Sequence, residues 1–408
     1  MSSATPRISN QIYDDLWLPD ETLAVRKQVR NFAETVLRPI AHELNNTPES
    51  VAAFPWQLLK KMGDAGLLRI PFEKQYGGAG LEYPTLATMV MLEEIAYVSS
   101  GVAAALIDVQ LILFGHTLKH AQPSLKEKLF PALCRGEIVG AFATSEPGAS
   151  TDLSVKALKT EARKVEGGYR VSGRKRWITN APVAHYMFVL CKIEAGMTML
   201  LVDMSSDGVR VGEPDKKMGN HCQLTADVYF DDVFVPDENL VGESGAGLKA
   251  ALTSLTLGRV GIGACGVGMA QAAFDFSSAY MKKREIFGKT IAQFQYWQFK
   301  FAEYATQLEN ARNLYVKAAL IVDKKRPNIQ SMCAMAKLIG SSLAGDVARD
   351  AIQVCGGYGF VKELAATGEQ FPLEAIYRDS KIGEIYEGAN EVQRLVIARA
   401  IFGKDCVG

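Results

Sequence analysis

Apolar side chains recur every three to four residues along the first third of the chain and then alternate with polar ones. The helical spacing runs from about Pro19 to Arg135, with glycines between successive stretches. From about Ile138 to Val241 the period falls to two residues, and valine, tyrosine and phenylalanine become common. A period near 3.6 favours amphipathic helices, and a period of two favours half-buried strands. The pattern therefore predicts a helical region followed by a mostly antiparallel β region.

Helical spacing returns after about Gly245 and continues in three long stretches. Their lengths and apolar stripes are typical of a helix bundle. The chain is therefore predicted to be an α+β protein with three parts. These are an N-terminal helical domain at 1–137, a middle β domain at 138–243 and a C-terminal helical bundle at 244–408.

Composition and charge narrow the class of partner. The 408 residues are 48% hydrophobic and 22% charged with zero net charge, which argues against nucleic acid or an anionic membrane surface as a partner. No apolar run is expected to span a bilayer, because Asp108 and Gln110 interrupt the most apolar stretch, 101–116, which favours a buried helix. The seven scattered cysteines lack a CxxC pair and indicate a reduced, cytoplasmic chain.

Two short motifs suggest chemistry that their context does not support. "GIGACG" (261–266) matches a dinucleotide fingerprint, but helical sequence precedes it where a strand is required, so the small residues are expected to let helices approach closely. His116 and His120 have metal-ligand spacing without a third ligand. No G-x-S-x-G elbow is present either.

Three separate segments carry residue types that suit a flat, phosphate-bearing cofactor. In "AFATSEPGASTD", a β run enters a loop where Ser145, Ser150 and Thr151 offer hydroxyls. In "RWITN", Trp177 and Thr179 share one face of a strand, so the indole can cover a ring whose edge the threonine meets. "REIFGKTIAQFQ" and "QVCGGYGF" supply a phosphate-pairing arginine and two adjacent glycines. Each segment alone has an ordinary alternative: a hairpin loop, a packed tryptophan, or a helix end.

Near the C-terminus, "IYEGANEVQR" places Glu387 before what looks like a helix. Most glutamates are solvated, so the residue alone is ambiguous. Gly388 removes bulk beside it, and Asn390 is predicted to cap the helix with Gln393 as its capping-box partner.

In this order and domain pattern, the chain closely resembles the acyl-CoA dehydrogenase family. The resemblance extends over nearly the whole length and is carried by "SEPGASTD", "RWITN", "REIFG", "QVCGGYGF" and "YRDSKIGEIYEGANEVQRLVIAR". It implies a helical domain, a β domain and a four-helix domain, in a homotetramer that binds FAD between the β domain and the C-terminal helices. The implied activity is oxidation of an acyl-CoA to the trans-2-enoyl thioester, with an electron-transfer flavoprotein or another acceptor as partner.

The resemblance also implies roles for single residues. Glu387 matches the catalytic base that takes the α-proton while the β-hydride goes to N5 of FAD. Thr151, Arg259, Tyr386 and Gly388 are expected to border the thioester substrate. The positions expected to contact the flavin end are Phe142, Thr144, Ser145, Trp177 and Thr179, with Ala389 and Glu391 also beside the cofactor. Those expected to reach the neighbouring subunit's FAD are Arg284, Phe287, Gln295, Gln353, Gly356 and Gly357.

Departures from the family pattern leave alternatives open. Ala389 stands where many relatives have threonine, and the 361–376 link looks longer than usual. Some relatives carry the catalytic base one residue before the arginine that corresponds to Arg259. This chain has Gly258 there, which cannot act as a base and so favours Glu387. The alternatives are an acyl group on a carrier protein, an oxygen-using acyl-CoA oxidase of the same fold, and a non-catalytic acyl-binding protein. Retention of Glu387 and of the flavin motifs argues against the last.

Overall fold

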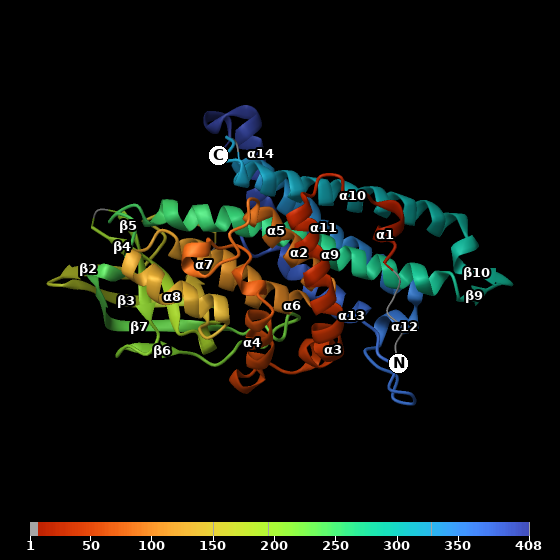
Figure 1. Cartoon of the computed structure of the whole chain (residues 1–408), viewed down its shortest axis with the longest axis horizontal. Helices are drawn as coiled ribbons and strands as arrows, with labels where there is room; N and C mark the ends of the chain where they lie inside the picture. Colours follow the sequence, from red (N-terminus) through yellow and green to blue (C-terminus); the bar gives the residue numbers. More distant parts are fainter. Residues whose placement is uncertain (1–6, 150, 195, 328, 408) are drawn as a thin grey trace.

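Long helices connect two dissimilar ends of the molecule, a β-sheet at one end and a small hairpin at the other (Figure 1). The computed structural model describes residues 7–149, 151–194, 196–327 and 329–407. As predicted, the strands of the sheet domain lie in the middle of the chain, between an N-terminal and a C-terminal helical part. The domain boundaries given above stay predictions.

The N-terminal part is a set of packed helices whose middle members are buried on every side. α5 lies among α2 and two C-terminal helices, α9 (Gly247–Met281) and α10 (Gln295–Asp323), which explains why its sequence is apolar all round. Two stretches, η1 and η5, are π-helical, and η5 runs for eleven residues between α6 and α7. The helices are α1 (Ser9–Ile12), α2 (Asp20–Phe32), η1 (Ala33–Leu37), α3 (Arg38–Asn46), η2 (Val51–Ala53), α4 (Trp56–Asp64), η3 (Leu67–Arg69), η4 (Lys74–Tyr76), α5 (Pro84–Ala96), α6 (Ser100–Ala103), η5 (Ala104–Phe114), α7 (Gly115–Leu118) and α8 (Pro123–Arg135).

The middle part is an eight-stranded sheet in the order β6-β7-β3-β2-β4-β5-β8, with β1 beside β4. Its pairs are antiparallel except β1–β4 and a single β2–β4 pair, so the expectation of a mostly antiparallel sheet is met. The strands are β1 (Gly140–Ala143), β2 (Glu161–Val165), β3 (Gly168–Thr179), β4 (Tyr186–Ile193), β5 (Gly196–Asp203), β6 (Val209–Val211), β7 (Thr225–Pro236) and β8 (Leu240–Val241), with short turns η6 (Ala181–Val183) and η7 (Asp237–Asn239).

The C-terminal part contains the three long helices that the spacing predicts. The glycine-rich motif continues inside α9 and lets it touch α11: a Cβ at Gly266 would lie 2.2 Å from the carbonyl oxygen of Gly340. The elements are α9 (Gly247–Met281), β9 (Glu285–Ile286), β10 (Lys289–Thr290), η8 (Ile291–Gln293), α10 (Gln295–Asp323), α11 (Ile329–Cys355), α12 (Gly357–Phe360), α13 (Leu373–Ser380), η9 (Lys381–Glu384), α14 (Asn390–Phe402) and η10 (Lys404–Cys406).

Within the described residues, two helical stretches are long and apolar enough to cross a membrane, so the expectation that none would be is wrong. They are Ser100–Leu118 and α9, with mean hydropathies of 1.6 and 1.3 in their most apolar windows. Those windows are 94% and 78% buried inside the protein. Their apolar character is therefore accounted for by the core, as predicted for the stretch around Asp108.

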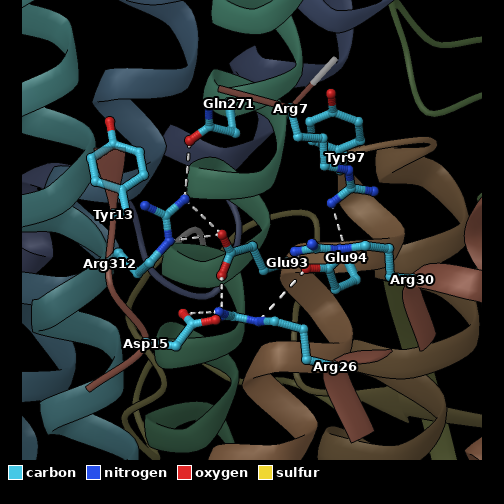
Figure 2. Close-up of a pocket in the computed structure, with 10 residues that line it drawn as sticks. All are labelled: Arg7, Tyr13, Asp15, Arg26, Arg30, Glu93, Glu94, Tyr97, Gln271 and Arg312. Atoms are coloured by element: carbon cyan, nitrogen blue, oxygen red, sulfur yellow. Dashed lines mark hydrogen bonds and ion pairs between the residues drawn. The ribbon is translucent and has the colours of Figure 1, made fainter. Parts of the chain in front are cut away.

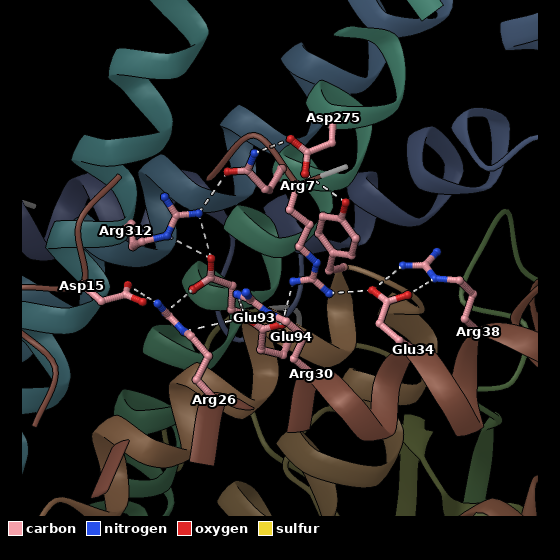
Figure 3. A network of polar contacts seen from close by, with 12 residues as sticks. Arg7, Asp15, Arg26, Arg30, Glu34, Arg38, Glu93, Glu94, Asp275 and Arg312 are labelled. Carbon is pink, nitrogen blue, oxygen red and sulfur yellow. Dashed lines mark hydrogen bonds and ion pairs between the residues drawn. The ribbon is translucent and has the colours of Figure 1, made fainter. Parts of the chain in front are cut away.

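A polar network ties the N-terminal segment to the helices (Figure 3). Glu93 on α5 accepts hydrogen bonds from Arg312 on α10 at 2.8 and 2.9 Å and from Arg26 on α2 at 3.2 Å. Neighbouring Glu94 binds Arg7 and Arg30. The network borders a cavity of about 240 Å³ (Figure 2), lined by Arg7, Tyr13, Asp15, Arg26, Arg30, Glu93, Glu94, Tyr97, Gln271 and Arg312. These groups are largely paired with one another, which favours a structural role.

Candidate active site

Glu387 lies in a strained bend between η9 and α14. Its φ is 56°, in the left-handed region, and the next residue, Gly388, has a φ of 87°. Such a backbone costs a non-glycine residue about 1–3 kcal/mol and persists only where its surroundings hold it. The carbonyl oxygen of Glu387 accepts from Nε of Arg259 and Nε2 of Gln393, both at 3.4 Å. Gln393 also donates to the carbonyl of Gly388 at 2.7 Å. Side chains of α9 and α14 therefore hold this bend.

The carboxylate of Glu387 is directed into the protein, toward α9. Its Oε2 atom is buried without a hydrogen bond among the described residues. It lies against α9, where a Cβ at Gly258 would stand only 2.6 Å away. Burial raises the pKa of Glu387 to about 7, while the charges of Arg259 and Lys337 act in the opposite direction. A carboxylate with such a pKa, free of partners, is suited to accept a proton near neutral pH.

The predicted cap at Asn390 is wrong, because the helix begins one residue earlier than a cap there would allow. Ala389 occupies the N-cap position, and no side chain caps the helix. The Asn390 side chain is buried instead: its Oδ1 accepts from Nζ of Lys337 at 2.8 Å, and its amide nitrogen donates to Ser341 at 3.1 Å. Asn390 therefore anchors α14 to α11 and positions the lysine whose charge acts on Glu387.

On the sheet side, the structure brings the predicted flavin-facing residues together at the ends of β1 and β3. Phe142 and Thr144 are buried, and the backbone nitrogen of Arg176 donates to the carbonyl of Ser145 at 3.0 Å. β3 is irregular between Lys175 and Ile178, and there Trp177 has a φ of 57°.

This irregularity leaves Trp177 61% exposed, and Thr179 accepts a hydrogen bond from Nε2 of Gln223 at 3.1 Å. A large indole held out on a strained backbone beside a polar side chain fits one wall of a flat ring system. The residues present therefore fit a flavin.

A buried ion pair braces this wall. Lys175 is fully buried, and its Nζ donates to Oε1 of Glu146 at 2.9 Å. Glu146 also accepts from the backbone nitrogens of Lys159 and Thr160 at 2.7 and 3.0 Å. The ion pair between Lys175 and Glu146 therefore holds the "SEPG" loop to β3. In the same segment Thr151 is exposed, and Ser150 lies outside the described residues.

The second predicted cofactor segment is far from the first within one chain (Figure 1): β9 and β10 lie at the opposite end from the sheet. Its members are all exposed: Arg284, Phe287, Gln295, Gln353, Gly356 and Gly357. Phe287 is 94% exposed at a φ of 50°. One chain alone does not bring the two sets together, as expected if the second set serves a neighbouring subunit.

The remaining predicted positions border the bend. Arg259 is buried, while Tyr386, Gly388 and Ala389 are half-buried and Glu391 is exposed. Ala389 and Glu391 line a shallow cleft of about 170 Å³ at the start of α14. Two supporting residues, Gln223 and Lys337, were missed from the sequence, and Gln393, predicted as a capping-box partner, donates instead to the carbonyls of the bend. Their partners are distant in the chain or set by the bend, so no local pattern marks them.

The three parts of the chain match three family descriptions in order. The acyl-CoA dehydrogenase N-terminal domain matches residues 19–137, the middle domain 141–233 and the C-terminal domain 245–402. The chain belongs to the acyl-CoA dehydrogenase family. It is therefore an FAD-dependent oxidoreductase that acts on the CH–CH group of an acyl-CoA.

Individual relatives cover almost the whole chain, and their names refer to different substrates. The mitochondrial short-chain specific acyl-CoA dehydrogenase of Mus musculus is 36% identical over 392 residues, which is 95% of this chain and 91% of that protein. The 3-(aryl)acrylate reductase of Clostridium sporogenes is 37% identical over 380 residues, 92% of this chain and 96% of that protein. The solved butyryl-CoA dehydrogenase of Megasphaera elsdenii superimposes with a TM-score of 0.87 at 32% identity, covering 94% of this chain and 98% of that one. Family membership alone does not fix the acyl group.

Proposed function

We propose that this protein oxidises a short acyl-CoA to its trans-2-enoyl thioester, with Glu387 as the catalytic base. The observation that carries the assignment is the buried Oε2 of Glu387, which has no partner among the described residues. Its raised pKa, about 7, suits a group that must be unprotonated before turnover and protonated after it. Two of the relatives act, by their names, on short or butyryl chains, which favours a short acyl group.

The bend itself supplies a second element of the proposed chemistry. No hydrogen bond within the described residues is donated by the backbone N–H of Glu387. This N–H is therefore available to a thioester oxygen, on which negative charge develops as the α-proton leaves. A single oxyanion donor of this kind is typically worth about 3–4 kcal/mol. Arg259 and Gln393 keep the donor in place by holding the Glu387 carbonyl on the other side of the residue.

FAD, when bound, supplies the hydride acceptor at N5. We propose that Trp177 and Thr179 border its ring system, and that Arg284, Phe287 and Gln353 of a neighbouring subunit complete the site. The exposure of Phe287, which lies in the turn between β9 and β10, and the position of this hairpin at the end opposite the sheet support a site shared between subunits of a proposed homotetramer. An electron-transfer flavoprotein is the proposed electron acceptor. Two alternatives within the same fold have to be excluded: an acyl group on a carrier protein instead of CoA, and oxygen as the electron acceptor.

Flavin bleaching tests the proposal. The purified holoenzyme is mixed anaerobically with butyryl-CoA, and turnover is followed with an artificial electron acceptor. Glu387→Gln is expected to retain FAD and bind butyryl-CoA, but to lose turnover and α-proton exchange by on the order of 10²–10⁴-fold. Turnover of Glu387→Gln near the parent rate would contradict the assignment of the base. Comparison of oxygen with a transfer flavoprotein then separates dehydrogenase from oxidase.

A further inference from the structure

A second carboxyl group lies buried beside Glu387, and the proposed reaction does not use it. Asp108, in the middle of the π-helical stretch η5, is 1% exposed. Its Oδ1 atom has no hydrogen-bond partner within the described part of the chain. An unsatisfied buried carboxyl costs stability, about 1–3 kcal/mol or more. No hydrogen bond within the described residues offsets the cost of burying Oδ1 of Asp108, so a bound ligand would have to do so.

Asp108 and Glu387 lie against the same face of α9. A Cβ at Gly258 would be 2.6 Å from Oε2 of Glu387, and a Cβ at Gly261 would be 2.7 Å from Oδ1 of Asp108. Residues three apart on a helix share a face and are separated by about 4.5 Å along its axis. α9 therefore makes room for two carboxyl groups about one turn apart.

The π-helical geometry helps to place Asp108 there. At the end of η5 the backbone nitrogen of Gly115 donates to the carbonyl of Gln110, five residues back. Each residue of such a helix is rotated relative to its place in an α-helix, and π-helical turns are frequent at functional sites. The side chain of Gln110 binds the start of β1, so η5 is fixed between the sheet and α9.

Among the described residues, no cation lowers the pKa of Asp108. Its pKa is raised well above the usual value, first by burial and then by the negative charge of Glu387. The positive charges of Arg259 and Lys337 act on Glu387 instead. Apolar atoms lie on one side of this carboxyl group: a Cβ at Gly261 would also lie 3.0 Å from Leu92 and 3.2 Å from Ile112. Cys265 and Tyr386 are also near, since burial first, and also the charge of Asp108, raise the pKa of each. The site therefore offers an unpaired carboxyl oxygen beside apolar side chains.

We propose that Asp108 determines substrate specificity by accepting a hydrogen bond from a hydroxyl or ammonium group on the acyl chain, a few carbons beyond the bond that is oxidised. The inference rests on the proposed function, since Glu387 marks where the α-carbon lies. A plain alkyl chain would leave Oδ1 without a partner. An acyl chain ending in a carboxylate would bury a negative charge beside the two carboxyl groups of Asp108 and Glu387.

Matched acyl-CoA substrates test the inference without any mutation. ω-Hydroxypentanoyl-CoA and ω-aminopentanoyl-CoA each have a polar group where hexanoyl-CoA has its terminal methyl. At least one is expected to exceed hexanoyl-CoA in kcat/KM by about tenfold or more, because a site built to bind a hydrogen-bond donor discriminates against the analogue that lacks it. Glutaryl-CoA is expected to be a poor substrate, with a lower kcat/KM than hexanoyl-CoA.

Two variants then assign the preference to Asp108. Asp108→Leu is expected to reverse the preference in favour of hexanoyl-CoA. Asp108→Asn keeps a hydrogen-bonding oxygen, so it is expected to spare the hydroxyl substrate and lose the ammonium one. Asp275→Asn is the matched control: this buried aspartate of α9 binds Gln271, Tyr97 and the backbone of Ile8, and its replacement should leave the preference unchanged.

The outcomes are distinguishable. Equal or better use of hexanoyl-CoA by the parent protein would overturn the inference. So would Asp108 variants that change all substrates equally, or that only move the pH profile, since Asp108 would then act through Glu387. If Asp108→Leu does not fold, binding of the same pairs to Glu387→Gln, read from the flavin spectrum, still measures the preference. Failure of every acyl-CoA, butyryl-CoA included, to bleach the flavin would instead reject the proposed function.

Discussion

Gly258 and Glu387 are in such close contact that residue 258 has no room for a side chain: a Cβ there would lie 2.6 Å from Oε2 and 3.0 Å from the carboxyl carbon of Glu387. Residue 258 also precedes the arginine that holds the Glu387 carbonyl. One turn of α9 therefore sets both ends of the catalytic residue, the carboxylate through Gly258 and the backbone through Arg259.

Gly258→Ala should displace the carboxylate without unfolding the helix. Alanine has a higher helix propensity than glycine, so stability should change little. A shift of about 1 Å in a catalytic group can cost about 10²-fold in rate, and kcat is expected to fall by that order. Gly345→Ala on α11 is the control, because the nearest atom to its new Cβ is 3.7 Å away. Equal kcat in Gly258→Ala and the parent would show that Glu387 acts from another position.

The pH profile should report the ionisation of Glu387. The base must be unprotonated to accept the α-proton, so kcat/KM is expected to rise with pH through about 7. Lys337→Met removes a charge that lowers the pKa of Glu387, so the midpoint should move to higher pH. Lys337→Arg keeps the charge and should leave the midpoint near its original place. A midpoint near 4.5 in the parent would contradict the burial of the carboxylate.

The same raised pKa has a consequence for stability. The folded pKa of Glu387 lies above its ordinary value of 4.5, so the native state binds the proton more tightly than the unfolded chain does. This contribution is fully present below pH 4.5 and is lost as pH rises through about 7. Denaturant unfolding of the apoprotein, compared with Glu387→Gln across this range, should show a pH-dependent decline in the parent that is weaker in the variant.

Glu93 should be among the most sensitive positions for stability. Burial alone would raise its pKa, but Arg312 and Arg26 lower it to about 2. Glu93→Gln leaves two buried arginines without their shared counter-ion and should cost about 3–5 kcal/mol. Chemical unfolding would measure the loss, with Glu137→Gln in an exposed pair as the control. Because the pKa of Glu93 is lowered, its contribution is present above pH 4.5 and should decline as pH falls toward 2.

Phe287 should matter to assembly more than to folding. It is 94% exposed in the single chain, so Phe287→Ser removes no core contact. We expect normal helix content but weaker FAD retention and a smaller mass by light scattering. Phe234→Ser, an exposed phenylalanine of β7, is the control. Unchanged mass and FAD content in Phe287→Ser would argue against the shared site.

The sequence predicts elements well where the periodicity is long and uninterrupted. α9, α10 and α11 follow their apolar stripes, and the helical reading of "GIGACG" is confirmed. The strained backbones at Trp177 and Glu387 were not predicted, since left-handed conformations of non-glycine residues are imposed by contacts from elsewhere in the chain. The assumed cap at Asn390 failed for a similar reason: a buried lysine on α11 competes for its side chain.

In the candidate site too, local sequence predicts some residues, while contacts between distant segments determine the others. Glu387 can be found from its motif, but its partners Lys337 and Gln393 depend on how α11 and α14 pack. Asp108 is an instructive case. In the sequence it is only a charge that interrupts an apolar run; in the structure it is a buried, unpaired carboxyl group that faces α9 beside the base. A lone charge inside an otherwise buried helix is therefore a useful signal of function.

The N-terminal segment also constrains the order in which the molecule can be completed. The backbone nitrogen of Ile8 donates to Asp275, and the hydroxyl of Tyr13 donates to the carbonyl of Ala305, 267 and 292 residues further along the chain. A ribosome releases residues 8 and 13 long before it has made their partners. This stretch must therefore wait, unpaired, until α9 and α10 have emerged and packed. Its docking follows the formation of α9 and α10, so a fusion or tag next to it would interfere with a later step of folding than the formation of those helices.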